Sequence, residues 1–382
     1  MSDAFVTDDT RHHLQISRRI HSRVILAKLK NTMTTILKQL PLLPEFKKFI
    51  IASKSGRRVM PSGKKIRPGT IEQYECVYKL LQQYQLSLHQ PLRITLLHRS
   101  SLRTIRKEKN YWSRFFKNFA AFLYKEKQCF DFYVQGVFKI IKTFFNYLSL
   151  EKSQPVGEFH KQFRIPAETM SPIILSPAQL RFLITDRAFE ESLPICLQRT
   201  KDIFVFGCTV ALRHQDLMGL KKEHIRFSGQ SACLVLHTQK TGAAVNIPLP
   251  AYAMHIYNKY KKQAGRYVLP RLSGSNLNLQ IKELIMRAGW NHILPKIRHR
   301  QGVPVEIKNN RKESMRFYEQ ITVHTMRRTA ITTLLLLGVD ESSVRRISGH
   351  AAGSKEFYKY VGLVQDILNE KVKAAHEKLL EA

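Results

Sequence analysis

The chain has 382 residues, which is long enough to bury two sizeable cores, so we expect a smaller domain followed by a larger one. Its 63 Lys and Arg residues against 29 Asp and Glu give a formal net charge of +34, spread along the whole chain. Such self-repulsion favours a polyanionic partner, with nucleic acid preferred over an anionic membrane, and argues against an enzyme that acts on neutral small molecules.

The sequence contains no run of 18 apolar residues, and its first residues are polar and acidic. We therefore expect neither a membrane span nor a signal peptide, and a cytosolic protein or, in a eukaryote, a nuclear one. The five cysteines show no spacing typical of metal ligands, so we expect neither a zinc site nor disulfides; they are Cys76, Cys129, Cys196, Cys208 and Cys233.

The first part of the chain is predicted to be helical and basic. We expect a basic N-terminal region over residues 1–65, which reads accessory DNA sites, extends the helical core or is a plain basic extension, and a helical core over residues 66–152. Residues 53–70 are rich in helix breakers and cations, as in a linker whose charges could follow a phosphate backbone. Thr70 is expected to cap the first helix of the core.

Within the helical core, aromatic and basic residues alternate in the segment around Trp112. Rings at helical spacing are more often buried than stacked on bases, so we expect them in the core and the cations on the opposite face. Residues 153–174 carry three prolines and are predicted to be a linker, and residues 175–382 form the second domain.

The second domain is predicted to begin with a helix capped by Ser176 and to continue in helices to about residue 220. A strand pair at 232–239 and 244–249 follows, with Gly242 in its turn. We expect a further helix at 276–289, a basic irregular or β segment at 295–322, and helices to the end. The predicted fold class is therefore mainly α with a small β-sheet (α+β), a helical domain followed by a mixed α/β domain.

Four local signals carry chemistry, although each alone has a structural explanation. Arg213 ends a predicted buried helix, with Asp216 three residues later, and such pairs are usually structural. Lys240 lies in the hairpin turn, where a lysine is normally only solvated. His324 and Arg327 form an HxxR motif at a helix start, where residues three apart share a face.

The fourth signal is a Gly-His pair followed by two tyrosines: His350 lies 23 residues after Arg327, and Tyr358 and Tyr360 come soon after it. The order arginine, lysine, HxxR, Gly-His and tyrosine resembles the active-site set of the tyrosine recombinase (phage integrase) family, in particular the integrases of mobile elements. The resemblance implies a helical core DNA-binding domain at 66–152 and a catalytic domain at 175–382.

The resemblance also implies a reaction, DNA cleavage and rejoining through a covalent 3′-phosphotyrosine, with no metal, ATP or other cofactor. Arg213 and Arg327 would clamp the phosphate oxygens, because planar guanidinium groups bind them bidentately. Lys240 would protonate the 5′-oxygen leaving group. His324 and His350 would position the phosphate and handle the tyrosine proton.

The resemblance leaves the role of Asp216 and the choice of the nucleophilic tyrosine to be assigned. Asp216 is expected to orient Arg213 and not to act as a base. The family's usual position for the nucleophile, nine residues after the Gly-His histidine, is Lys359 here, so either tyrosine requires a one-residue shift. We favour Tyr360, which ends a segment resembling one branch of integrases, and keep Tyr358 as the alternative.

The expected partners are double-stranded DNA, other copies of the chain in a homo-tetramer formed by exchange of the C-terminal helix, and DNA-bending accessory proteins; no membrane is expected. The expected location is the cytoplasm, in association with the nucleoid. Two other functions stay open: a type IB topoisomerase-like enzyme, which would relax supercoils without sequence demand, and an inactive DNA-binding relative of an integrase, which would never form an adduct.

Overall fold

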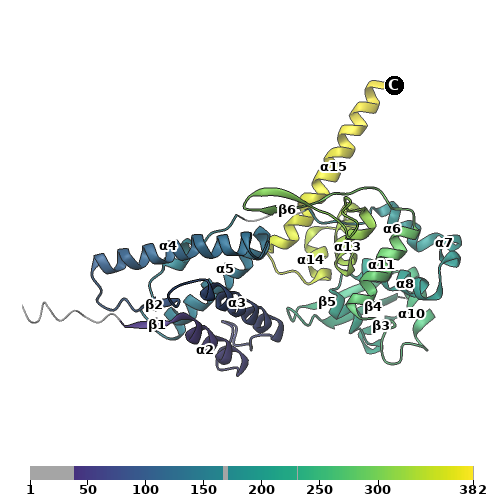
Figure 1. Ribbon diagram of the computed structural model, residues 1–382. Helices are drawn as coiled ribbons and strands as arrows, with labels where there is room; N and C mark the ends of the chain where they lie inside the picture. The colour runs from purple at the N-terminus through teal and green to yellow at the C-terminus, as the bar shows by residue number, and fades with distance from the viewer. Residues whose placement is uncertain (1–37, 167–170, 230, 382) are drawn as a thin grey trace, which may run out of the picture. The chain divides into compact units, whose positions relative to one another are not determined.

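The computed structural model describes residues 38–166, 171–229 and 231–381 (Figure 1). Contacts divide these residues into two compact units. Unit 1 takes the described residues before 168 together with His299–Val303, and unit 2 takes the described residues from 171 to Arg298 and from Pro304 onward. Most of the basic N-terminal region expected over residues 1–65 lies outside the described residues.

Unit 1 is a helical bundle with one small antiparallel sheet. Its helices are α2 (Leu42–Lys54), α3 (Pro68–Leu86), α4 (Leu102–Lys125) and α5 (Asp131–Asn146), with a π-turn at Tyr147–Glu151 and a 3-10 turn at Phe159–Gln162; its strands are β1 (Gln39–Pro41) and β2 (Arg93–Thr95). Helix α2 packs against α3, and its buried side chains belong to the same hydrophobic core as those of α3, α4 and α5. The described part of the expected N-terminal region is therefore continuous with the helical bundle.

Aromatic rings form the centre of unit 1. Trp112 and Phe119 on α4 are buried and pack against Phe145 and Phe138 of α5 at ring-centroid distances of 4.8 and 5.8 Å. The cations of α4 lie on its opposite, exposed side. The expected division between buried rings and outward cations is therefore found. The expected cap is displaced, because α3 begins at Pro68 with Arg67 as its N-cap and not at Thr70.

Unit 2 contains the remaining elements (Figure 1), apart from the hairpin turn His299–Val303, which belongs to unit 1. Its helices are α6 (Pro177–Thr185), α7 (Arg187–Ser192), α8 (Ile195–Val210), α9 (His214–Met218), α10 (Ala251–Tyr260), α11 (Gly274–Arg287), α12 (Phe317–Gln320), α13 (Val323–Leu336), α14 (Glu341–Ser348) and α15 (Lys355–Glu381), with a 3-10 turn at Lys222–His224. A three-stranded antiparallel sheet consists of β3 (Ile225–Ser228), β4 (Ser231–His237) and β5 (Ala244–Leu249), and β6 (Lys296–Arg300) pairs with β7 (Val303–Ile307).

These elements confirm the expected fold class, mainly α with small sheets. Ser176 caps α6 in a full capping box with Gln179, as predicted. The sequence missed β3, a short strand of three exposed residues and one buried one, whose pattern is too brief to stand out. Helix α8 is buried along most of its length and packs against α6, α10, α11 and α13, so it is the central helix of the unit.

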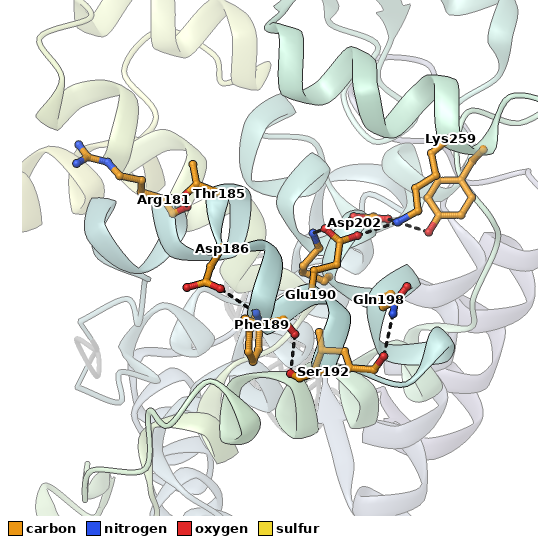
Figure 2. A network of polar contacts seen from close by, with 12 residues as sticks. Arg181, Thr185, Asp186, Phe189, Glu190, Ser192, Gln198, Asp202 and Lys259 are labelled. Atoms are coloured by element: carbon orange, nitrogen blue, oxygen red, sulfur yellow. Dashed lines mark hydrogen bonds and ion pairs between the residues drawn. The ribbon is translucent and has the colours of Figure 1, made fainter.

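A balanced ion-pair network fixes the middle of α8 (Figure 2). Lys201 contacts Glu190 of α7 at 2.6 Å and Asp202 at 3.4 Å, and Lys259 of α10 contacts the same two carboxylates at 2.9 and 2.8 Å. The Tyr260 hydroxyl donates to Asp202. Two ammonium groups thus face two carboxylates, and the arrangement holds α7, α8 and α10 together with no net charge left over.

Candidate active site

The site begins where α8 ends. Ala211, the C-cap of α8, takes a left-handed conformation with φ of 54° and is fully buried. The chain then extends through Arg213, which is the N-cap of α9. The reversal leaves the Ala211 carbonyl oxygen outside the α8 hydrogen-bond ladder, and this oxygen accepts a 2.8 Å bond from Nη1 of Arg327. The end of the central helix therefore positions two arginines at once.

Arg327 lies in the first half of α13 and is only 6% exposed. Besides the Ala211 carbonyl, its guanidinium contacts the His350 ring, with Nη2 3.0 Å from Nε2. Burial lowers the pKa of Arg327 to about 10, the positive charge of Arg213 adds to this effect, and Tyr360 and Asp216 oppose it. Arg327 thus stays charged at neutral pH, while the two groups that it bonds carry no negative charge.

His350 follows the left-handed Gly349 that ends α14. The Ser348 hydroxyl lies 2.7 Å from the Val344 carbonyl and 2.8 Å from Nδ1 of His350. Because that hydroxyl has one proton and the carbonyl can only accept, the consistent arrangement has Nδ1–H donating to Ser348. Nε2 is then free of a proton and accepts from Arg327.

The electrostatic surroundings favour the same neutral form of His350. Burial, followed by repulsion from Arg327 and Arg213, lowers the pKa of His350 to about 3. The ring is therefore neutral at physiological pH, and its two nitrogens keep their hydrogen bonds to Ser348 and Arg327. Ser348, which is not among the predicted site residues, fixes the orientation of this ring.

The two candidate tyrosines on α15 lie in different surroundings. Tyr360 is half-buried, its ring centroid lies 6.2 Å from that of His350, and it packs on the cluster around the buried Phe357. Tyr358 is 48% exposed, and its ring centroid lies 6.3 Å from that of Phe357. The structure thus brings Tyr360, and not Tyr358, to the Arg327 and His350 pair.

Lys240 is exposed in the turn between β4 and β5, where Gly242 has the expected positive φ of 71°. Asp216, which is 3% exposed, accepts a 2.8 Å bond from the backbone N–H of Gln239, the residue before Lys240. The sequence predicts that Asp216 orients Arg213, but the described residues show no hydrogen bond between these two side chains. The carboxylate instead ties α9 to the turn that carries Lys240.

His324 occupies the first turn of α13, three residues before Arg327, as the HxxR motif predicts. Partial burial lowers its pKa, and Arg328 is the next cause, followed by His214, Arg327 and Lys240. The positive charges of Lys240 and the arginines therefore act together on His324. Among the predicted site residues Asp216 is the single acid, so this part of unit 2 is suited to bind an anion.

A cavity of 410 Å³ lies beside these groups, between α9, the Lys240 turn and the start of α11. Its lining includes His214 and Gln239, the sequence neighbours of Arg213 and Lys240, and Arg271. Burial lowers the pKa of His214. His214 is not among the residues predicted from the sequence, because one histidine next to an arginine has no distinctive spacing. Among the described residues, no three His, Cys, Asp or Glu side chains are grouped as metal ligands.

This α+β domain, with two arginines, a histidine and a tyrosine at the end of its central helix, has the fold of the recombinases that cleave DNA with a tyrosine. Three solved structures share that fold. The Tn1549 transposon integrase in complex with circular intermediate DNA is 16% identical, covers 84% of this chain and 95% of its own, and has a TM-score of 0.54. The XerH site-specific recombinase bound to palindromic difH substrate is 12% identical, with 88% and 98% covered and a TM-score of 0.60.

The third is a lambda integrase dimer bound to a core site, which is 13% identical, with 91% and 86% covered and a TM-score of 0.51. No curated protein matches the chain. Residues 190–363 match the model of the phage integrase family, a range that holds every predicted catalytic residue. The chain therefore carries a phage integrase family domain and is an enzyme that cleaves and rejoins DNA, and the resemblance to tyrosine recombinases drawn from the sequence is confirmed.

Proposed function

We propose that the protein is a site-specific DNA recombinase that cleaves one strand with Tyr360 and forms a covalent 3′-phosphotyrosine. The observation that supports this best is the unbalanced charge of Arg327. Its guanidinium is buried, remains protonated and bonds only a carbonyl oxygen and a neutral imidazole. A buried cation without a carboxylate partner is costly, and a phosphate oxygen of the substrate would supply the missing negative charge.

Arg213 completes the proposed phosphate clamp. Its Nη1 is buried and has no hydrogen-bond partner among the described residues, although its charge acts on both Arg327 and His350. A buried donor of this kind is normally satisfied, so a bound group is the simplest partner. Two guanidinium groups on the non-bridging oxygens would stabilise the charge that develops at phosphorus during attack.

The bond changes balance without a cofactor. The Tyr360 oxygen attacks phosphorus, the bond from phosphorus to the 5′-oxygen breaks, and Lys240 gives that oxygen a proton. The tyrosine proton passes to the neutral His324, because both ring nitrogens of His350 are engaged with Ser348 and Arg327. Attack by a 5′-hydroxyl of another strand reverses these steps, so one phosphoester bond is exchanged for another and rejoining needs no external energy source.

A covalent-adduct experiment tests this proposal. The protein is incubated in EDTA with nicked suicide duplexes that span the ends of the genetic element encoding it. We expect an adduct with the wild type and with Tyr358→Phe, and none with Tyr360→Phe. An adduct lost in Tyr358→Phe and kept in Tyr360→Phe would move the nucleophile, and tight binding without any adduct would indicate an inactive DNA-binding relative.

Assembly is a further part of the proposal. Helix α15 extends 27 residues, and the part after the buried Val364 projects from unit 2 with Leu368 39% and Val372 56% exposed (Figure 1). Docking of this end on another protomer would build a homo-tetramer on two DNA sites, and DNA-bending proteins would assist it. Deleting residues after 366 should abolish assembly in sedimentation on DNA and leave single-site binding intact.

For the described residues, no helix is long and apolar enough to cross a membrane. We propose a cytoplasmic enzyme associated with the nucleoid, because its substrate is DNA. Imaging of a fluorescent fusion that followed the cell envelope instead of the DNA would contradict this location.

A further inference from the structure

Unit 1 contains a long segment without a single acidic residue. Between Glu45 and Glu72 the sequence has eight Lys and Arg residues and no Asp or Glu. Most of these cations fall in the basic loop, defined here as residues 55–67, which joins α2 to α3. From its composition alone this loop was predicted to be a linker, but its structure is ordered by specific contacts.

The backbone of the basic loop folds into a small hairpin. Val59 and Lys65 form an antiparallel bridge, the Met60 N–H donates to the Lys64 carbonyl at 2.8 Å, and the Gly63 N–H donates to the Met60 carbonyl at 2.8 Å. Gly63 supplies the positive φ of 73° that the reversal requires. Ile66, 8% exposed, anchors the returning end in the core of unit 1.

One cation of the loop, Arg58, points into the fold. Its Nε donates to Glu151 at 3.0 Å, and its guanidinium lies 4.8 Å from the centroid of the Phe49 ring. Nη1 is also 3.5 Å from Ser53 Oγ and from Tyr74 Oη. These partners come from α2, α3 and the π-turn after α5, so a side chain only 10% exposed holds the loop against three elements.

The remaining cations of the loop point outward. Arg57, Lys64 and Lys65 are exposed. Two carboxylates of this part of unit 1 are already paired, because Glu151 binds Arg58 and Glu75 binds Lys54. The loop therefore presents concentrated positive charge on a backbone whose conformation is fixed before any partner arrives.

We propose that the basic loop is a preformed contact for the phosphate backbone of duplex DNA, and that Arg58 is a positioning residue and not a DNA contact. This inference rests on the proposed function, which makes duplex DNA the substrate. Fixing the loop in advance lowers the entropy that binding would otherwise cost. Each phosphate neutralised releases counterions, which gives the contact a signature in the salt dependence of binding.

The first experiment measures the affinity of the full chain for a duplex at several salt concentrations. Lys64→Ala/Lys65→Ala should lower the slope of log affinity against log salt by about 2, since each phosphate contact contributes about 0.9. The control, Lys48→Ala/Lys54→Ala, removes two lysines of α2 that are paired with glutamates, and its slope should change by less than half as much. Equal changes in both variants would overturn the assignment to the loop.

The second experiment separates positioning from charge. Glu151→Ala removes the carboxylate that holds Arg58, so it should weaken DNA binding about two- to fivefold even though it makes the chain more positive. The matched control Glu158→Ala makes the same change in charge at an exposed ion pair with Lys161, and should bind as well as or better than the wild type. Tighter binding by Glu151→Ala would overturn the positioning role of Arg58.

The outcomes distinguish this inference from the proposed function. If the wild type forms the Tyr360 adduct while Lys64→Ala/Lys65→Ala keeps the wild-type salt slope, the loop is not a DNA contact and the recombinase proposal stands. If the wild type forms no adduct but the loop variants show the expected changes, the loop contact stands and catalysis through Tyr360 is contradicted.

Discussion

Two groups of charged residues lie against helix α8, and they are built on opposite principles. In its middle, Lys201 and Asp202 belong to the network in which two lysines face two carboxylates. At its end, the Ala211 carbonyl holds Arg327, which faces a neutral imidazole and the charge of Arg213. The charges of the first group cancel one another within the protein. The second group keeps an excess of positive charge, which a bound anion would neutralise.

Arg58 in unit 1 is a buried arginine that can be compared with Arg327. It is nearly as buried as Arg327, but a carboxylate and aromatic rings surround it, and nothing in its environment requires a ligand. Burial of an arginine is therefore not a mark of function by itself. What distinguishes the site is burial combined with partners that leave the positive charge uncompensated.

The largest expected effect comes from breaking the balanced network. Asp202→Ala should lower the free energy of unfolding by about 3–5 kcal/mol, because it leaves buried lysine charge with too few partners. Urea denaturation followed by circular dichroism measures this change. Glu158→Ala, at an exposed ion pair, is the control and should cost less than about 1 kcal/mol. A small effect at Asp202 would show that the network is not what holds α7, α8 and α10.

Changing Arg327 tests the unbalanced group. Arg327→Lys keeps a positive charge but cannot bond the Ala211 carbonyl and the phosphate in the same planar geometry, so cleavage should slow by roughly 10²–10³-fold. Single-turnover adduct formation measures the rate. Arg346→Lys on the exposed side of α14 is the control and should cleave like the wild type. A similar rate for both variants would remove Arg327 from the proposed clamp.

The sequence predicts the residues of the active site, but it does not predict the balanced ion-pair network. The order of Arg213, Lys240, His324, Arg327 and His350 has a fixed spacing along the chain, and it indicated both the family and the candidate residues. The balanced network has no such spacing, since Glu190 and Lys259 lie 69 residues apart and meet only through the packing of α7 and α10.

The finer features of the site also depend on packing. The bond from Asp216 to Gln239 joins a helix to a turn 23 residues later, and a sequence does not reveal which neighbour a carboxylate will choose. The choice between Tyr358 and Tyr360 depends on which face of α15 meets Phe357 and His350. The ordered state of the basic loop depends on Arg58 reaching Glu151, 93 residues away.

A smaller effect is expected at Asp216. If it acts by holding the Lys240 turn, Asp216→Ala should slow cleavage about tenfold, whereas Asp216→Asn, which keeps an acceptor oxygen, should retain most of the rate. A substrate with sulfur in place of the bridging 5′-oxygen has a leaving group that needs no proton. This substrate should restore cleavage by Asp216→Ala; no restoration would mean that Asp216 acts through another group.

The smallest expected effect is a change of stability with pH, and it compares a buried histidine in each of the two units. Burial lowers the pKa of His160 in unit 1 to about 4, so the folded state binds a proton less readily than the unfolded chain, where the ordinary value of 6.5 applies. The stability that depends on neutral His160 is therefore fully present above pH 6.5 and is lost as the pH falls toward 4. Between pH 7 and pH 5 the loss should be about 1–2 kcal/mol.

His160→Phe separates this contribution from that of His350. The ring stacks on Phe145 at 5.1 Å, and phenylalanine preserves the stacking while it removes the titrating group and the bond to Asn146. The variant should lose less stability than the wild type between pH 7 and pH 5 in urea denaturation. If the two curves fall in parallel, the acid sensitivity belongs to the neutral imidazole of unit 2, where protonation of His350 would place a third positive charge beside Arg213 and Arg327.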